Sequence, residues 1–409
     1  MEPPDEVGAQ LAPTPAAAPG GRLRVVLDLT PAARQRAGIG RYTRELGAAL
    51  VERNAHHYRV FVADRGHGPL DLAGRRVAPR YAPVPGRLLA ALWHRLRLPL
   101  PAEVFAGRAD VYHAMDFLAP PLVAARSVVT VHDLSFLRHP EAADAALARH
   151  LARRLPPAVR AAHHVLVDSD NTRRDVLELL GISAERVSVA YPGVRGDFGD
   201  TVDWERIRAV REKYCLPGPY LLGVGTIEPR KDWQRLIEAF AAAPPGTTLA
   251  IAGGPGWRME SIEAAAWNSR SPVRLLGFVT DADLAALYHG AAAFAYPSRY
   301  EGFGLPPLEA MAAGVPCLVS DAGSLPEAVG SAALVVAAGD DEALARGVAR
   351  ILTDRELRTR LRVEGPRRAA RFTWAATAAV AEAAYRRAAR RRAPGPPRPR
   401  DDGPQTAPE

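Results

Sequence analysis

The stretch Ser298–Glu309, SRYEGFGLPPLE, decides the fold of this chain. The alternating apolar run AAAFAYP just before it predicts a strand, and Pro306 and Pro307 suit the first turn of a helix, where a missing amide proton costs nothing. The segment therefore predicts a strand, a glycine turn and the start of a helix. Gly302 and Gly304 let the backbone approach a ligand closely, and the free amides at the start of the helix can bind an anion.

The same stretch carries side chains that suit a nucleoside diphosphate. The predicted cradle for the diphosphate consists of the amides of Gly302, Phe303, Gly304 and Leu305. Glu309 lies about one turn into the helix, where its carboxylate can accept hydrogen bonds from two vicinal hydroxyls of a ribose. Glu301 is predicted to face the cleft from the strand end. The alternative, a glycine corner whose acid compensates the helix dipole by about 0.3–1 kcal/mol, would explain Glu309 alone.

Seven residues separate Glu301 from Glu309 within EGFGLPPLE, and this pattern resembles the signature of the retaining nucleotide-sugar glycosyltransferases of family 4. The resemblance implies the α/β fold called GT-B. In that fold two doubly wound Rossmann-like domains face each other across a cleft, and a C-terminal helix crosses back to the first domain. It also implies hexosyl transfer with retention of configuration, in which the departing phosphate oxygen can take the proton of the acceptor hydroxyl.

Length and composition agree with two domains. The chain has 409 residues, of which 48% are apolar, and it contains no uncharged apolar run long enough to span a membrane. The N-terminus MEPPDEVGAQ is acidic and proline-rich, unlike a signal peptide. Cys215 and Cys317 lack metal-ligand spacing, and Cys317 lies in the apolar run VPCLVS. We therefore predict a reduced, cytoplasmic location.

A formal charge of +8 and a pI near 9.8 raise a different hypothesis, a basic protein that binds nucleic acid or membrane without catalysis. Much of the excess charge lies in RRAARRRAPGPPRPR, residues 386–400, which contains seven arginines and no aromatic residue. Without aromatic side chains for stacking, nucleic acid is not expected as a partner. Two interpretations stay open, a solvated helix end with a disordered tail, and peripheral attachment to anionic lipid on the cytosolic face of a membrane.

Strand and helix patterns alternate along both halves of the chain and predict two parallel sheets. Predicted strands of the first half are RLRVVLDL, YRVFVA, ADVYHAM, SVVTVHD, HHVLVDS and VSVAYPGV; those of the second half are YLLGVGT, TLAIAGG, VRLLGF, AAAFAYP and PCLVSD. We predict a disordered segment 1–21, an acceptor domain 22–214, a donor domain 215–373, a crossover helix 374–392 and a disordered tail 393–409. Ligands are expected at the carboxyl ends of the strands.

Two basic residues follow the first strand of the second half. In GTIEPRKD, residues 225–232, Arg230 and Lys231 can clamp a diphosphate and stabilise it as the sugar departs, so neither a metal nor another cofactor is expected. The segment resembles the donor-phosphate segment of family 4 enzymes, including many mannosyltransferases. It favours GDP-mannose, with a UDP-hexose or a dTDP-deoxysugar as alternatives. The base is expected against Phe278 and Val279, after the third strand of this half.

The first half contributes a second set of candidates. GIGRYTREL resembles a frequent opening of family 4 members, and its Gly38, Gly40 and Arg41 are predicted to form an acceptor or phosphate loop. His132, which ends a strand, resembles the family's active-site histidine and is predicted to be catalytic together with Glu301, Arg230 and Lys231, with Asp133 beside it. A structural histidine bonded to Asp133 or to backbone is the alternative.

The run Asp168-Ser169-Asp170 resembles the Asp-x-Asp metal site of another glycosyltransferase fold. A helix pattern follows directly, however, so we interpret Ser169 or Asp170 as its N-cap.

The acceptor is less determined by the sequence, and a glycan, a lipid-linked saccharide or a small molecule are all compatible with it. The segments Arg65–Arg80 and Pro85–Pro101 are expected to select it. In the second segment leucines and Trp93 alternate with basic residues, namely Arg87, His94, Arg95 and Arg97. This pattern predicts either an amphipathic helix that faces the core or a patch that lies on a membrane.

Other functions on paired Rossmann-like halves fit less well. A nucleotide-sugar epimerase or a phosphorylase shares the architecture, and fold alone excludes neither. An NAD-dependent oxidoreductase is disfavoured, because no GxGxxG motif follows the first strand with an acid about twenty residues on.

Overall fold

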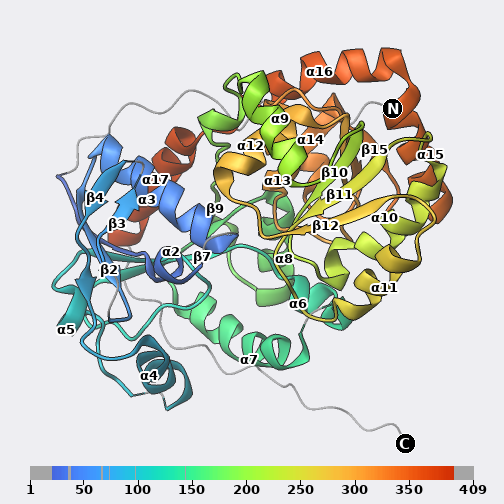
Figure 1. The fold of residues 1–409 in the computed structure, drawn as a ribbon. Helices are drawn as coiled ribbons and strands as arrows, with labels where there is room; N and C mark the ends of the chain where they lie inside the picture. The colour runs from blue at the N-terminus through green and yellow to red at the C-terminus, as the bar shows by residue number, and fades with distance from the viewer. Residues whose placement is uncertain are drawn as a thin grey trace, which may run out of the picture.

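The computed structural model describes residues 21–390, apart from residues 36, 37, 66, 67, 73, 97 and 143. Within that range the chain folds around two parallel sheets, each covered by helices on both faces (Figure 1), which confirms the predicted α/β architecture. The ends predicted to be disordered fall almost entirely outside the described residues, and so does most of the arginine-rich segment 386–400.

The first sheet has the strand order β5-β2-β1-β6-β7-β8-β9. Its strands are β1 (Arg24–Asp28), β2 (His57–Val62), β5 (Arg80–Tyr81), β6 (Val111–Ala114), β7 (Arg126–Val131), β8 (His164–Val167) and β9 (Val187–Val189). Neighbouring strands are parallel throughout this sheet. The sequence did not predict β5 or the antiparallel hairpin of β3 (Leu70–Leu72) and β4 (Arg75–Val77).

The second sheet has the order β12-β11-β10-β13-β14-β15 and is also parallel. Its strands are β10 (Tyr220–Val224), β11 (Thr248–Ala252), β12 (Val273–Gly277), β13 (Ala293–Tyr296), β14 (Cys317–Ser320) and β15 (Leu334–Val336). All but β15 were predicted. In both sheets the order reverses near the first strand, β1 or β10, and such a reversal opens a crevice at the carboxyl ends of the strands.

Helices cover the two sheets. Those of the first half are α2 (Thr30–Arg34), α3 (Ile39–Arg53), α4 (Gly86–Ala90) with a π-helical turn (Ala91–Arg95), α5 (Glu103–Ala106), α6 (Ser135–Arg138), α7 (Ala145–Ala161) and α8 (Asp170–Leu180). The second half follows with α9 (Trp204–Lys213), α10 (Trp233–Ala239), α11 (Glu260–Asn268), α12 (Asp281–Gly290), α13 (Leu305–Ala312), α14 (Leu325–Val329), α15 (Asp341–Thr353), α16 (Arg355–Ala369) and α17 (Trp374–Arg390).

Side-chain caps explain where several helices begin. Thr280 accepts a hydrogen bond from the amide of Asp283 at 3.3 Å and starts α12. Ser169 accepts one from the amide of Thr172 at 3.0 Å and starts α8, so the N-cap interpretation of this serine is confirmed. The short helix α2 begins at Thr30, where Pro31 suits the first helical turn.

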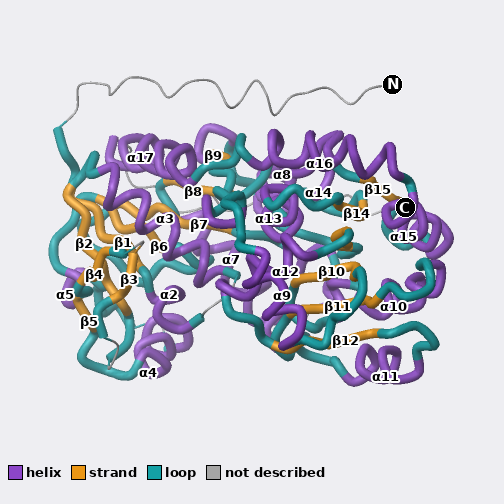
Figure 2. Tube along the Cα trace, turned by 45° about the horizontal axis from the view of Figure 1, so that its top comes forward, coloured by secondary structure: helices purple, strands orange, loops and turns teal. Residues whose placement is uncertain are grey.

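The C-terminal helix α17 returns to the first sheet, as predicted (Figure 2). It packs on α3 and on β6 to β9, and Tyr385 is completely buried in the core of that half. Glu382 pairs with Arg53 of α3 at 3.0 Å, and the Tyr385 hydroxyl lies 2.8 Å from Nδ1 of His113 on β6. The chain therefore crosses between the halves twice. A domain division near residue 214 stays our proposal.

The segment Pro85–Pro101 buries part of its apolar side chains in the core, as one of its two predicted interpretations requires, and its contact with a membrane stays a prediction. Leu89 and Trp93 are buried in the first-sheet core, whereas Leu88 and Leu96 are 49% and 62% exposed. Among the described residues, no helix combines the length and the apolar character that crossing a membrane requires.

Candidate active site

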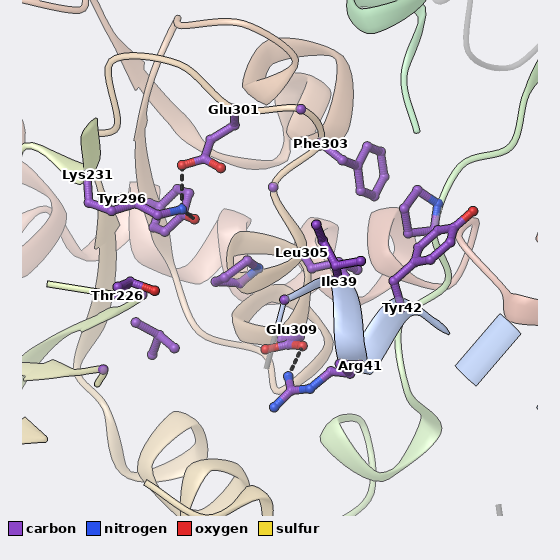
Figure 3. Close-up of a pocket in the computed structure, with 18 of the residues that line it drawn as sticks. Ile39, Arg41, Tyr42, Thr226, Lys231, Tyr296, Glu301, Phe303, Leu305 and Glu309 are labelled. Atoms are coloured by element: carbon purple, nitrogen blue, oxygen red, sulfur yellow. Dashed lines mark hydrogen bonds and ion pairs between the residues drawn. The ribbon is translucent and has the colours of Figure 1, made fainter. Parts of the chain in front are cut away.

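A cavity of about 330 Å³ lies between the two sheets, at the carboxyl ends of their strands (Figure 3). Nearly all the predicted site residues line it: Gly38, Arg41, His132, Asp133, Arg230, Lys231, Phe278, Val279, Glu301, Gly302, Phe303, Gly304, Leu305 and Glu309. Gly40 does not line it. A Cβ atom at Gly40 would lie 2.1 Å from the carbonyl oxygen of Gln35, so this glycine permits the close turn before α3.

The glycine turn between β13 and α13 forms one wall of the cavity. Gly304 has φ +103°, a backbone conformation that favours glycine, and it precedes Leu305, the first residue of α13. A Cβ atom at Gly302 would lie 2.2 Å from the carbonyl oxygen of His132 in the first half of the chain. Gly302 therefore permits the two halves to touch at the centre of the site.

Both predicted cations lie on one carboxylate. The Lys231 ammonium is 2.7 Å from Oε1 of Glu301 and 2.5 Å from the Tyr296 hydroxyl. The Arg230 guanidinium is 3.1 Å from Oε2 of Glu301 and 2.8 Å from Glu228. Lys231 and Glu301 are buried. Glu301 thus holds Lys231 and Arg230 side by side in the lining of the cavity. Figure 3 shows its contact with Lys231.

The charges of this cluster depend on one another. Burial alone would raise the pKa of Glu301, but Arg230 and Lys231 lower that pKa to about 2. Burial and the neighbouring Arg230 lower the pKa of Lys231, and Glu301 opposes that fall. Glu301 is therefore ionised at neutral pH, and it helps to keep Lys231 protonated.

Glu309, predicted to hold a ribose, is bonded across the cavity. Its Oε1 lies 2.7 Å from the Arg41 guanidinium of α3, and its Oε2 accepts a hydrogen bond from the Tyr288 hydroxyl at 2.9 Å. Arg41 also pairs with Asp281 at 2.5 Å. The first half of the chain thus contributes a guanidinium that reaches two carboxylates of the second half, and Figure 3 shows its contact with Glu309. No local sequence pattern indicates this pairing, because the partners are 268 and 240 positions apart.

His132 is held by two acceptors. Its Nδ1 lies 2.7 Å from Oδ2 of Asp168, and its Nε2 lies 2.9 Å from the Met115 carbonyl oxygen. A carbonyl can only accept, so Nε2 carries a proton, and the carboxylate favours a second proton on Nδ1. Burial lowers the pKa of His132, but Asp168 outweighs it and raises that pKa to about 9. His132 is therefore a fixed cation at neutral pH.

Asp168 is a site residue that the sequence interpretation missed. The sequence points to Asp168 only through a resemblance to a metal motif, and it offers Asp133 or backbone as partners of a structural His132. The backbone partner is present as the Met115 carbonyl oxygen. The carboxylate of Asp133 instead accepts hydrogen bonds from the amide and hydroxyl of Ser135, at 2.8 and 2.6 Å. Asp168 lines the cavity at the end of β8, beside the strand that carries His132. A signal was present, since both residues directly follow predicted strands.

Within the described residues, no group of three or more His, Cys, Asp or Glu side chains is arranged to hold a metal ion. The absence of a metal from the reaction stays a prediction. The two parallel sheets and the cavity between them define a fold of the GT-B type, and the site combines buried cations, free helix amides and acids that face a central cavity.

Comparison with known proteins identifies the family. Residues 210–368 match the family of glycosyl transferases group 1, and residues 36–197 match Glycosyltransferase Family 4. The O-antigen chain mannosyltransferase B of Escherichia coli is 31% identical over 375 residues, which cover 86% of this chain and 96% of that protein. The chain therefore belongs to glycosyltransferase family 4 and is a glycosyltransferase.

Two further proteins illustrate the range of similarity. The serotype-specific mannosyltransferase WbdA of Escherichia coli is 31% identical over 386 residues, which cover 84% of this chain but 45% of that protein. Sucrose-phosphate synthase from Thermosynechococcus elongatus superimposes with a TM-score of 0.71 at 22% identity, covering 89% of this chain and 98% of that one. This second similarity concerns the fold alone.

Proposed function

We propose that this enzyme transfers a mannosyl group from GDP-mannose to a hydroxyl group of a glycan, with retention of anomeric configuration. One observation carries the nucleotide-sugar part. Arg230 and Lys231 both line the cavity and both contact Glu301. The residues whose free amides start α13 line the same cavity. The similarity to two mannosyltransferases and the segment GTIEPRKD support mannose as the transferred sugar.

In this proposal the two halves of the chain contribute different groups to the reaction. Arg230, Lys231 and the α13 amides stabilise the diphosphate as its bond to the anomeric carbon breaks. The acceptor oxygen forms its bond to that carbon from the same face, and its proton passes to the departing phosphate oxygen. Glu301 holds the two cations in place. His132 supplies a fixed positive charge from the first half, so both halves must meet around the substrate.

Glu309 is proposed to bind the two ribose hydroxyls. Its carboxylate already accepts a guanidinium and a phenol hydroxyl, but each carboxylate oxygen can accept a further hydrogen bond. We propose that Arg41 orients this carboxylate from across the cavity. The base then lies toward Phe278 and Val279, which also line this cavity.

A thermal-shift screen against GDP, UDP and dTDP tests the donor. A nucleotide at 100 times its dissociation constant adds about 2.7 kcal/mol to the free energy of unfolding. We expect the largest shift with GDP, followed by release of GDP from GDP-mannose in the presence of a glycan acceptor. A larger shift with UDP or dTDP would replace GDP-mannose as the donor, and no shift with any of the three would refute the nucleotide site.

We also propose that the enzyme contacts anionic membranes through the exposed part of the segment Pro85–Pro101, where a lipid-linked glycan would be available on the cytosolic face. Leu88, Leu96 and Leu98 are 49%, 62% and 44% exposed, and the neighbouring side chains of Arg87 and Arg95 are exposed as well. Such a combination of apolar and basic side chains suits an anionic interface.

Co-sedimentation with liposomes at two salt concentrations tests this contact, because salt screens the electrostatic part. We expect binding to phosphatidylglycerol vesicles that weakens at the higher salt concentration and in Leu88→Gln/Leu96→Gln. Val363→Gln, which changes a residue that is 51% exposed on α16, should bind as the wild type does. Equal sedimentation of all three proteins would contradict the proposed surface.

A further inference from the structure

A second cavity of about 220 Å³ opens at the carboxyl ends of β1, β2 and β6 of the first sheet. Residues of α2 and α4 form part of its lining. We infer that this cavity binds the accepting sugar as a single neutral hexopyranoside ring, with Asp116 accepting hydrogen bonds from the ring hydroxyls. The inference rests on the proposed glycosyl transfer and names the class of acceptor for it.

The two cavities adjoin at the turn Met115–Phe117, which follows β6. Met115 and Asp116 line the second cavity, and the carbonyl oxygen of Met115 is bonded to His132, which lines the first. The ring of Phe117 packs edge-on against the His132 ring, with centroids 5.7 Å apart. A sugar in the second cavity would therefore lie beside the place where the donor sugar must be held.

Phe117 has φ +52°, an unusual conformation for a large side chain. Its amide bonds to the carbonyl oxygen of Thr130 on β7, which holds the turn in this conformation.

Most polar groups around the second cavity already have partners. Asp28 accepts hydrogen bonds from the Thr30 amide at 3.0 Å and from the Tyr112 hydroxyl at 2.7 Å. Arg34 pairs with Asp64 at 3.1 Å. The side chain of Asp116 is different, since no hydrogen bond joins it to any residue that the structure describes. Burial raises the pKa of Asp116, and the charge of His132 opposes that rise.

The size and charge of the second cavity point to one neutral ring. Its volume lies below the roughly 300 Å³ at which pockets for drug-sized ligands begin, so a single pyranose fits better than a longer chain. Trp93, Leu118 and Pro120 supply apolar surface for a ring face. Asp28 and Asp116 add negative charge while Arg34 is paired with Asp64, so a phosphate group would be repelled.

Binding and kinetics with two probes test the assignment in the full chain. The neutral probe is methyl α-D-mannopyranoside and the anionic probe is mannose 6-phosphate, with binding followed by saturation-transfer NMR. The variants are Ala90→Trp, which fills the second cavity, and Asp116→Asn, which removes its available charge. Asp200→Asn, at an exposed position, is the matched control. Hydrolysis of GDP-mannose without acceptor reports the donor cavity separately.

We expect the wild type to bind the neutral probe, with Ala90→Trp abolishing that binding and Asp116→Asn weakening it about tenfold through loss of charge-assisted hydrogen bonds. Donor hydrolysis should stay within about twofold of the wild-type rate in Ala90→Trp and in the control. Preference of the wild type for mannose 6-phosphate, or unchanged neutral-probe binding in Ala90→Trp, would overturn the inference. If the wild type neither hydrolyses GDP-mannose nor binds any of the three nucleotides, the proposed function itself fails.

Discussion

The two halves of the donor cavity are built in different ways. The half that belongs to the second sheet includes one short segment, Glu301–Glu309, which is joined by Arg230 and Lys231 from the loop after β10. The half that belongs to the first sheet collects side chains from separate elements. These include Arg41 on α3, His132 after β7 and Asp168 after β8.

This difference shows which part of a site can be predicted from a local sequence motif and which part depends on the fold. In the second half, the short motif Glu301–Glu309 carries much of the predicted chemistry, although its Glu301 pairs with Lys231, which is 70 positions away. In the first half, His132 and Asp168 are 36 positions apart and meet only because β7 and β8 are adjacent in the sheet. The charge of His132 is therefore a product of the fold.

The largest effect is expected from Lys231→Ala in the second half. Removing a cation that stabilises the leaving diphosphate should lower kcat by roughly 10²–10³, as loss of one preorganised donor does elsewhere. Steady-state kinetics at saturating GDP-mannose measures this. The chain has two lysines, so Lys213→Ala is a natural control. Lys213 also bonds to an acid, Asp283 at 2.6 Å, but its side chain is 58% exposed outside the cavity. If both variants keep kcat near the wild-type value, the leaving-group role is wrong.

The second-largest effect is expected from Asp168→Asn, which tests the charge of His132 in the first half of the chain. The folded-state pKa of His132, about 9, is raised above the ordinary value of 6.5, so protonation of His132 contributes stability below pH 6.5. That contribution disappears as pH rises through 9. Its size is on the order of 3 kcal/mol at most. We therefore expect Asp168→Asn to be less stable than the wild type at pH 6, with the difference shrinking by pH 9.5.

Urea unfolding at several pH values measures this difference, and an NMR titration of the His132 ring locates its pKa directly. Asp110→Asn is the control, because Asp110 pairs at 2.6 Å with Arg24, which stays charged over the whole range. Its destabilisation should not depend on pH. A His132 pKa near 6.5 in the wild type would show that Asp168 does not stabilise the charged form of His132. The first half would then not obtain a fixed charge from the pairing of distant residues.

The sequence predicted the second half better than the first, for a physical reason. Two glycines, two prolines and two acids in the stretch Ser298–Glu309 each restrict the backbone or the ligand chemistry locally, and the structure places them around one cavity as expected. The positions of the main strands along the chain followed from their buried apolar runs. The catalytic roles of the site residues stay predictions, because the geometry brings these residues together but shows no reaction.

What the sequence did not reveal depends on long-range pairing or on very short elements. The strand β15 has three residues and its side chains are partly exposed, so its pattern is too short to recognise. The helix α7 contains Pro156 and Pro157 in its interior, which local propensity argues against. The contact of Arg41 with Glu309 joins the two sheets, and only the packed structure shows it.

A smaller effect is expected from Glu309→Gln, which tests whether the two halves cooperate at the ribose. Hydrogen bonds to a charged group contribute about 1.5–3 kcal/mol, so the dissociation constant for GDP should rise about 10- to 100-fold. Isothermal titration calorimetry measures it. Glu263→Gln changes an exposed acid on α11 and should leave the affinity unchanged. Unaltered GDP binding in Glu309→Gln would mean that Glu309 serves only to hold Arg41.

The smallest effect is expected from Phe278→Ala. The base is predicted to lie against the segment after β12 through backbone contacts, and the Phe278 side chain is 53% exposed at the cavity wall. Truncating an exposed ring changes free energies by about 0.5 kcal/mol or less, so the GDP affinity should change by no more than about twofold. Calorimetry with GDP and UDP checks this, with Trp267→Ala, at a position that is 89% exposed, as the control. A tenfold loss with GDP in Phe278→Ala alone would instead show that the ring stacks on the base, and a side chain rather than the backbone would then recognise the donor in the second half.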